Sequence, residues 1–307
     1  MTSPRLEISL CGIAMKNPVM AASGTYGYGV EFESVADLNA LGALVTKGLS
    51  REPMKGNPAP RLWETEAGMM NSIGLQNVGV RAFVADKLPH LKQWQTPVIA
   101  NVFGYALDDY LEVVRVLNDA EGLAAYEINA SCPNTKHGGM VFSADPVELA
   151  GLVSAVKAIA KRPILIKLSP NVTSIPVIAR AAEEAGADAL SLVNTFVALA
   201  IDLDTRQPRL GAGTGGLSGP AIKPIALRMV WEAFRSVKIP VVGLGGIASG
   251  TDAAEFLVAG ATAVEVGTAS FWDPGAPQRI AQELDRWLAA QKTTVSATTG
   301  TLKFPTR

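Results

Sequence analysis

Eight short runs of apolar or β-branched residues recur along the chain and are separated by segments with helical periodicity. The runs lie at 19–22, 43–46, 98–101, 126–129, 164–167, 189–193, 241–244 and 263–266. Most are apolar throughout, which is typical of parallel strands that are buried on both faces of a sheet. We therefore interpret each run as one strand of a parallel sheet.

Helical periodicity follows most of these strands. The expected helices lie at 107–118, 146–160, 174–185, 221–236 and 251–259. Asp145 is a suitable N-cap before Pro146, and Gly186 and Gly260 stand where a left-handed residue ends a helix. An open doubly wound sheet is the alternative, but eight strand–helix units in series favour an α/β fold of the (β/α)₈ TIM-barrel type.

The remaining segments extend this barrel. Residues 6–15 predict a small N-terminal β-hairpin that closes the bottom of the barrel. Two long βα connections, 49–78 and 196–219, are expected over the C-terminal face, where long loops are usually functional. The sequence shows no second block of distinct composition, so we interpret 1–307 as a single domain, with residues 293–307 as a flexible polar tail.

Composition narrows the class of protein. The chain has 307 residues, of which 48% are hydrophobic and 18% charged, and its net charge is -1. These values predict a globular protein without a nucleic-acid partner. No apolar run approaches the roughly 20 residues of a membrane helix, so we expect a soluble, cytoplasmic protein. Two cysteines, Cys11 and Cys132, are too few for an iron–sulfur cluster, and no metal site is predicted.

Glycine pairs follow the seventh and eighth strands. Gly245-Gly246 and Gly267-Thr268 occupy the usual phosphate-binding position of a barrel, although tight turns also require glycine. Residues 211–216 match a dinucleotide-binding pattern but follow no strand, and 243–248 match a relaxed form at the barrel loop. We therefore expect a phosphate site and no NAD-binding fold.

Lysines and amides also stand near strand ends. Lys47 and Lys167 each close a strand, where a lysine needs an anion, and they permit a Schiff base, an anion anchor or a stabiliser of a reduced cofactor. The asparagines that accompany them are Asn71, Asn129, Asn134 and Asn194. Amides offer both a donor and an acceptor, so this set suits a planar anion with an amide or imide edge.

Cys132 is the residue with the most specific chemistry. It follows the fourth strand and precedes Pro133, which places it on a turn instead of in a packed strand. A thiol pKa near 8.5 permits either a general base or a nucleophile. His137 lies five residues further on, and the glycines of segment 132–146 suit a lid. The residues alone leave base and nucleophile open.

Three motifs carry a family resemblance. Residues 129–134 (NASCPN), 167–171 (KLSPN) and 71–77 (NSIGLQN) resemble the signatures of dihydroorotate dehydrogenases, and the likeness extends over about residues 6–288. A cysteine at position 132 resembles the soluble class, since the membrane-associated class has serine there. Residues 201–206 and 215–224 resemble class 1B, the NAD-linked branch, and not the branch that passes electrons to fumarate.

The resemblance implies one FMN per chain and oxidation of (S)-dihydroorotate to orotate in the synthesis of UMP. Cys132 would take a proton from C5 of the substrate while C6 gives a hydride to flavin N5. Lys167 would balance charge at the N1–C2 edge of the flavin, and Lys47 would oppose the substrate carboxylate. The implied FMN-binding residues are Ala22, Ser23, Lys47, Gly48, Asn101, Asn129, Lys167, Val193, Gly219, Gly245, Gly246, Gly267 and Thr268. The implied substrate-binding residues are Lys47, Asn71, Ser72, Ile73, Gly74, Leu75, Asn129, Asn134, Asn194 and Thr195.

The class 1B resemblance also implies a partner. An electron-transfer subunit with FAD and a [2Fe–2S] cluster would pass electrons to NAD⁺, and two catalytic chains would form a homodimer within a heterotetramer. Three alternatives remain open: a flavoenzyme similar to dihydropyrimidine dehydrogenase, a barrel lyase that uses Lys167 as a Schiff-base amine, and a non-catalytic barrel that binds a phosphate ligand.

Overall fold

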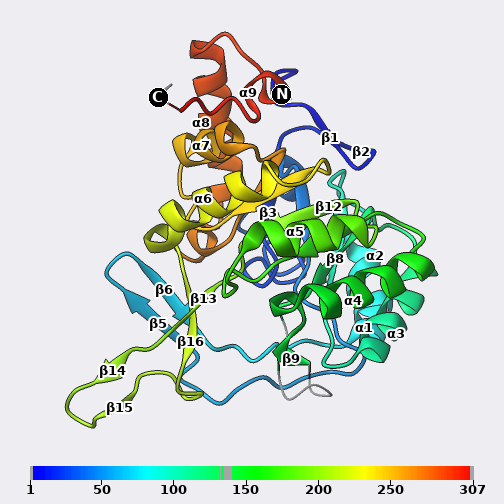
Figure 1. The fold of residues 1–307 in the computed structure, drawn as a ribbon, viewed down its shortest axis with the longest axis vertical. Helices are drawn as coiled ribbons and strands as arrows, with labels where there is room; N and C mark the ends of the chain where they lie inside the picture. The colour runs from blue at the N-terminus through cyan, green and yellow to red at the C-terminus, as the bar shows by residue number, and fades with distance from the viewer. Residues whose placement is uncertain (1–2, 132, 135–139, 305–307) are drawn as a thin grey trace.

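A closed barrel of eight parallel strands forms the centre of the molecule (Figure 1). The computed structural model describes residues 3–131, 133–134 and 140–304. The strands follow one another around the barrel in the order β11, β12, β17, β18, β3, β4, β7 and β8. Their bounds in chain order are β3 Val19–Ala21, β4 Ala43–Val45, β7 Val98–Val102, β8 Ala125–Asn129, β11 Ile164–Lys167, β12 Ala189–Leu192, β17 Val241–Leu244 and β18 Ala263–Val266. Every residue of these strands is buried, and the predicted (β/α)₈ barrel is confirmed.

Helices pack around the barrel. They are α3 Leu107–Asn118, α4 Pro146–Ile159, α5 Ile175–Glu184, α6 Lys223–Phe234, α7 Gly250–Ala259 and α8 Ala276–Ala290, with α1 Val80–Ala82, a π-helical turn Phe83–Lys87 and α2 Leu88–Leu91 before β7. The side chain of Asp145 caps α4, as its position before Pro146 predicts. α7 ends at Gly260, whose φ of 123° favours glycine, and a Cβ there would lie 2.2 Å from the Phe234 ring.

The predicted hairpin closes the bottom of the barrel. Strands β1 (Ile8–Leu10) and β2 (Ile13–Met15) pair in antiparallel register. Leu10 and Met15 pack against the lower barrel interior, which is filled by Met20, Val45, Ile99, Leu165 and Val242. Because this end is filled by apolar side chains, an open site is left to the opposite end, where the strands end in polar residues.

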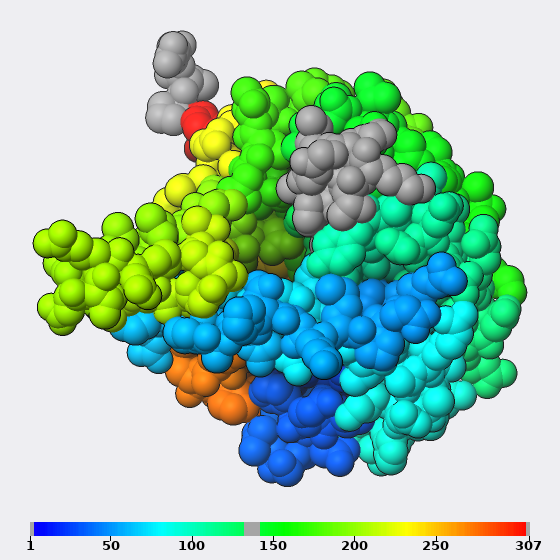
Figure 2. All heavy atoms as spheres, turned by 90° about the horizontal axis from the view of Figure 1, so that it is seen from below, coloured from blue at the N-terminus to red at the C-terminus, as the bar shows by residue number. Residues whose placement is uncertain are grey.

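The two long connections form structure of their own over that opposite end. They contribute a four-stranded antiparallel sheet in the order β13 (Phe196–Ala198), β16 (Gly215–Ser218), β6 (Gly68–Asn71) and β5 (Leu62–Thr65). Beyond it, β14 (Ile201–Asp202) and β15 (Gln207–Pro208) form a hairpin that projects as an arm (Figures 1 and 2). A short antiparallel pair, β9 (Pro133–Asn134) and β10 (Met140–Val141), follows β8.

The described part of the C-terminal segment packs on the barrel. Residues 295–298 form a short helix, α9 (Val295–Thr298), in which Val295 and Thr298 are buried. The Val295 N–H donates to the Arg5 carbonyl at 3.0 Å, which links the two ends of the described chain. The expected flexibility of residues 293–307 stays a prediction. Within the described residues, no helix is long and apolar enough to cross a membrane.

Candidate active site

A cavity of about 400 Å³ lies at the C-terminal ends of the barrel strands. Strand ends form its floor, and β6, β16 and the segment that follows β6 form its cover. The space-filling view shows the hollow between the base of the arm and the segment around residues 50–75 (Figure 2). The cavity therefore occupies the position at which barrel enzymes carry their active sites.

The cavity brings together nearly all the residues that the sequence predicted for a site. The predicted residues that line it are Ala22, Ser23, Lys47, Gly48, Asn71, Ser72, Ile73, Gly74, Leu75, Asn101, Asn129, Lys167, Val193, Asn194, Thr195, Gly219, Gly245, Gly246, Gly267 and Thr268. Cys132 lies outside the described residues, and the side chain of Asn134 is not described. The binding roles of these residues remain predictions.

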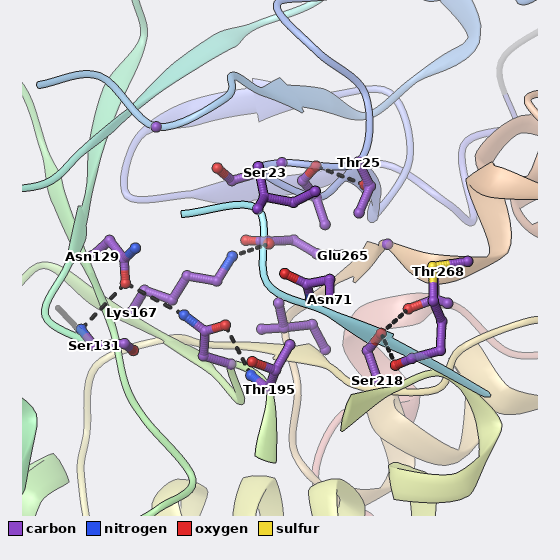
Figure 3. A pocket seen from close by; sticks show the side chains of 18 of the residues that line it. Ser23, Thr25, Asn71, Asn129, Ser131, Lys167, Thr195, Ser218, Glu265 and Thr268 are labelled. Atoms are coloured by element: carbon purple, nitrogen blue, oxygen red, sulfur yellow. Dashed lines mark hydrogen bonds and ion pairs between the residues drawn. The ribbon is translucent and has the colours of Figure 1, made fainter. Parts of the chain in front are cut away.

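Glycines and hydroxyl groups form one end of the cavity. Gly246 has a φ of 80°, and a Cβ there would lie 2.7 Å from the Gly219 carbonyl oxygen, so only glycine fits without a shift. The Thr268 hydroxyl donates to the Ser218 hydroxyl at 2.8 Å (Figure 3). This end offers close backbone approach and hydroxyl groups, which suit a phosphate.

Amide side chains line the other end. Asn129 is held through its backbone and its side chain. Its backbone carbonyl oxygen accepts from the Tyr110 hydroxyl at 2.8 Å, and its side-chain Oδ1 accepts from Ser131 N at 3.2 Å. Asn194 Nδ2 donates to the same Oδ1 at 3.4 Å (Figure 3). Asn71 reaches this end from β6, where its Nδ2 donates to the Gly216 carbonyl at 3.4 Å. Fixed amides of this kind can read the edge of a planar ring.

Lys47 is a half-buried cation without an ion pair among the described residues. Its backbone N–H donates to the Gly27 carbonyl at 2.8 Å, which fixes the end of β4. Burial lowers the pKa of Lys47, and the positive charge of Arg61 lowers it further. An anion in the cavity would relieve both effects, so Lys47 is suited to bind a carboxylate.

Lys167 has the opposite environment. Its Nζ lies 3.2 Å from Glu127 Oε1 and 3.1 Å from Glu265 Oε2, and the exposed fraction of its side chain is 6%. Burial alone would lower the pKa of Lys167, but the charges of Glu127 and Glu265 raise it above the usual lysine value. A lysine held in the charged form is a poor Schiff-base nucleophile, so the geometry favours an electrostatic role.

Sequence reasoning missed several residues of the cavity. Glu265, Ser131, Phe103, Met69 and Ser218 also line it. Glu127 and Glu265 stand inside runs that were interpreted only as apolar strands, and a carboxylate at such a position was the signal that could have found them. Within the described residues, no group of three or more His, Cys, Asp or Glu side chains is placed to hold a metal ion.

The residues present fit an FMN. The cavity joins a glycine-rich end that suits a phosphate to an amide-rich end that suits a ring, and a cation, Lys167, lies between strand ends on its floor. Three buried polar atoms in its lining, Ser72 Oγ, Ser131 Oγ and Glu265 Oε1, have no hydrogen-bond partner among the described residues. Buried polar atoms are normally paired, so these atoms indicate a polar ligand.

Comparison with known proteins agrees with this geometry. The family model for dihydroorotate dehydrogenase matches residues 5–288. A *Solibacter usitatus* protein, provisionally named dihydroorotate dehydrogenase A (fumarate), is 66% identical over 303 residues, which cover 98% of this chain and 100% of that protein. The *Geobacter sulfurreducens* protein named dihydroorotate dehydrogenase B (NAD(+)), catalytic subunit, is 57% identical over 289 residues, with 94% and 95% covered.

The fold has a solved counterpart. The crystal structure of DHODH in complex with ferulenol from *Eimeria tenella* superposes with a TM-score of 0.82 and 22% sequence identity, covering 98% of this chain and 89% of that chain. This likeness concerns the fold alone. The family model and the two bacterial relatives span almost the whole barrel and every strand end that lines the cavity. The chain therefore belongs to the dihydroorotate dehydrogenase family.

Proposed function

We propose that this chain oxidises (S)-dihydroorotate to orotate in pyrimidine biosynthesis, with one FMN bound in the cavity. One observation carries the proposal: a single cavity has a glycine-rich end and an amide-rich end, and Lys47 and Lys167 line it from the ends of two barrel strands. Membership of the family supports the same reaction. When bound, FMN would supply the acceptor for the hydride, one proton with two electrons, that leaves C6 of the substrate, while the proton from C5 goes to the base of the chain.

The chain's own residues would hold the cofactor. Gly219, Gly245, Gly246 and Gly267 would approach the phosphate with their backbone, together with the hydroxyl of Thr268. Lys167 would face the part of the ring that gains negative charge, because its ammonium is already fixed by two carboxyl groups. The cavity excludes solvent on its floor, where Asn101 and Lys167 are 1% and 5% exposed, and this strengthens the electrostatic contribution.

Substrate would lie between the amide side chains and Lys47. Lys47 would bind the carboxylate of dihydroorotate, since it lacks another counter-ion among the described residues. Asn71, Asn129 and Asn194 would hold the imide edge, because each has a fixed position and both donor and acceptor atoms. This carboxylate anchor favours dihydroorotate over dihydrouracil, the substrate of a dihydropyrimidine dehydrogenase-like enzyme.

Cys132 would act as the base at C5. The described residues before it support this placement, because Asn129 and Ser131 both line the cavity and Asn129 Oδ1 accepts from Ser131 N. The position of the thiol stays a prediction. A Cys132→Ser variant should retain bound FMN and lose most of its turnover at neutral pH, because a serine hydroxyl is a far weaker base than a thiolate. Unchanged turnover would defeat this assignment.

The relatives' names divide between fumarate and NAD⁺ as the electron acceptor. We propose NAD⁺, reached through a partner subunit that carries FAD and a [2Fe–2S] cluster. Residues 211–216 match a dinucleotide pattern, but Gly215 and Gly216 belong to the antiparallel strand β16. Residues 243–248 comprise the end of β17 and most of the loop that leads to α7 in the closed barrel. Neither segment forms a dinucleotide fold, so a separate chain would bind NAD⁺.

An assay with different electron acceptors tests both the proposed substrate and the proposed acceptor. The purified, FMN-loaded chain is assayed with dihydroorotate and either NAD⁺ or fumarate, alone and together with a candidate flavin–iron–sulfur subunit. We expect NAD⁺ reduction only when the subunit is present. Turnover with fumarate by the chain alone would replace the NAD⁺ proposal, and turnover of dihydrouracil but not dihydroorotate would replace the substrate.

The projecting arm is the surface best suited to a second copy of the chain. Val197 lies on β13 at the base of the arm, and Leu199, Ile201 and Leu203 follow at every second position toward and along it. Their exposed fractions are 70%, 54%, 52% and 82%. Exposed apolar side chains on a projecting element are typical of a protein contact. We propose a homodimer of catalytic chains, within a heterotetramer when the partner subunit binds, in the cytoplasm. Light scattering of a Leu203→Glu variant, which should be monomeric, tests the contact.

A further inference from the structure

Three charged side chains converge beneath the cavity from three barrel strands. Glu127 comes from β8, Lys167 from β11 and Glu265 from β18. Lys167 Nζ lies within 3.2 Å of one oxygen of each carboxyl group, and both glutamate side chains are 0% exposed (Figure 3 shows Lys167 and Glu265). We call these three residues the floor cluster.

The floor cluster has more acids than bases. If both glutamates were ionised, the cluster would carry one net negative charge on two carboxyl side chains that are 0% exposed. The strands beside β18 supply no other charge, because β3 (Val19–Ala21) and β17 (Val241–Leu244) contain no titratable residue. The charged groups that face Glu265 are therefore Lys167 and Glu127. An uncompensated buried carboxylate is strongly destabilising, because it loses its hydration without gaining a counter-ion.

The two glutamates differ in how well their negative charge is stabilised. Glu127 accepts from Asn101 Nδ2 at 2.6 Å, from Ser191 Oγ at 2.8 Å and from Lys167. Glu265 accepts from Lys167 alone among the described residues, and its Oε1 has no partner. Hydrogen bonds to a carboxylate favour its charged form, so a single proton shared by this pair belongs on Glu265.

The electrostatics agree with this geometry. Burial raises the pKa of Glu265, and the charge of Glu127 raises it further, against the lowering effect of Lys167. Burial alone would raise the pKa of Glu127, but Lys167 and the hydrogen bonds from Ser191 and Asn101 lower it. The pKa of Glu265 is thus raised above the ordinary glutamate value, and that of Glu127 is lowered below it.

We propose that Glu265 is carried as a neutral acid at neutral pH, so that the floor cluster has no net charge and Glu127 is the one counter-ion of Lys167. Glu265 is then a positioning residue that acts through Lys167. This proposal rests on the proposed function for its consequence: a neutral floor does not oppose negative charge that gathers in the cavity above it, whereas an ionised Glu265 would oppose it.

Isotope-edited infrared spectroscopy tests the proton directly. With glutamate labelled at its side-chain carboxyl carbon, the FMN-loaded protein at pH 7.5 should show the band of a protonated carboxylic acid, and Glu265→Gln should lack it. Glu255→Gln is the matched control, because it removes a carboxylate from a solvent-accessible lysine cluster (Lys223 Nζ–Glu255 Oε2, 2.8 Å) and should leave the band unchanged. Absence of the band in the wild type, or its persistence in Glu265→Gln, would overturn the proposal.

The midpoint potential of bound FMN supplies an independent readout. Glu265→Gln removes no charge from a neutral acid, so its potential should match the wild type. Glu127→Gln should also match it, because Glu265 would then ionise beside Lys167, and its infrared band should disappear. Only the double variant leaves Lys167 without a counter-ion and should have a raised potential. A stepwise rise in each single variant would mean that both glutamates are ionised, and would overturn the proposal.

The two proposals can fail separately. The infrared band is a property of the protein and is measured equally well on the FMN-free chain. If dihydroorotate fails to reduce bound FMN but the band is lost only in the floor-cluster variants, the function falls and the proton assignment stands. If reduction occurs and the wild type has no band, the function stands and the proton assignment falls.

Discussion

In the part of the chain that the structure describes, Lys167 and Lys223 each lie between two carboxylates, in two very different surroundings. Lys167 lies between Glu127 and Glu265 on the floor of the cavity, where the exposed fractions are 6%, 0% and 0%. Lys223 lies between Asp252 and Glu255 on the helices α6 and α7, where they are 26%, 15% and 45%. The residue types are nearly the same, so the difference isolates the effect of burial.

Exposure to solvent determines how many ionised groups each cluster can stabilise. At the surface cluster, solvent stabilises an excess negative charge, and the pKa of Asp252 is lowered. Burial alone would raise that pKa, but the hydrogen bond from Lys223 and those from Ala248 N and Ser249 lower it. On the floor, the excess carboxylate has no solvent, and Glu265 takes a proton instead. One lysine and two acidic residues thus form a solvated, charged cluster at the surface. On the floor of the cavity they form a cluster without net charge, which does not repel an anion.

The largest expected effect comes from removing each lysine. Lys167→Met leaves Glu127 buried without its counter-ion and should lower the free energy of unfolding by about 3–5 kcal/mol. Lys223→Met should lower it by about 1 kcal/mol or less, because its partners remain partly solvated. Urea unfolding at pH 7.5 measures both. Equal losses would show that burial is not what separates the two clusters.

A smaller effect follows from pH. The folded-state pKa of Glu265 is raised, so its contribution to stability is present below the ordinary glutamate pKa and is lost as pH rises through the raised value. The free energy of unfolding of Glu265→Gln relative to wild type should therefore increase with pH over that window, by at most about 1.4 kcal/mol per pH unit. Denaturant titrations across a pH series check this. A difference that is constant with pH would contradict a proton on Glu265.

The surface cluster should give the opposite pH dependence. The folded-state pKa of Asp252 is lowered, so its contribution is present above the ordinary aspartate pKa and is lost as pH falls through the lowered value. Asp252 also closes the capping box of α7 with Ser249. Asp252→Asn should cost about 1 kcal/mol at neutral pH and less in acid. A cost that grows in acid would contradict this sign.

The barrel was predictable because its strands are buried on both faces. Such strands are apolar throughout, and the predicted ranges 164–167, 241–244 and 263–266 match β11, β17 and β18 residue for residue. The sheet over the cavity was not predicted. β5 is mostly exposed and β16 begins with two glycines, so neither shows alternation, and their order depends on β6, which pairs Met70 with Leu217 far along the chain.

The site was predictable from two sources: the ends of the barrel strands and, for residues 71–75 in the long connection, the family resemblance. Lys47, Asn129 and Lys167 were found because residues after parallel strands meet at one end of a barrel. Glu127 and Glu265 were missed because the sequence does not show which distant residues a single carboxylate in an apolar run will contact in the fold. Their role follows only from the fold, in which β8, β11 and β18 bring both carboxyl groups to Lys167. The position of Cys132 relative to the cavity stays a prediction.

Anaerobic mixing of the FMN-loaded chain with dihydroorotate tests the central claim most directly. The experiment needs neither an acceptor nor a partner subunit, because it follows only the transfer from substrate to cofactor. The account predicts that the visible absorbance of oxidised FMN bleaches with one equivalent of dihydroorotate and that one equivalent of orotate forms. Bound FMN that stays oxidised in excess dihydroorotate would contradict it.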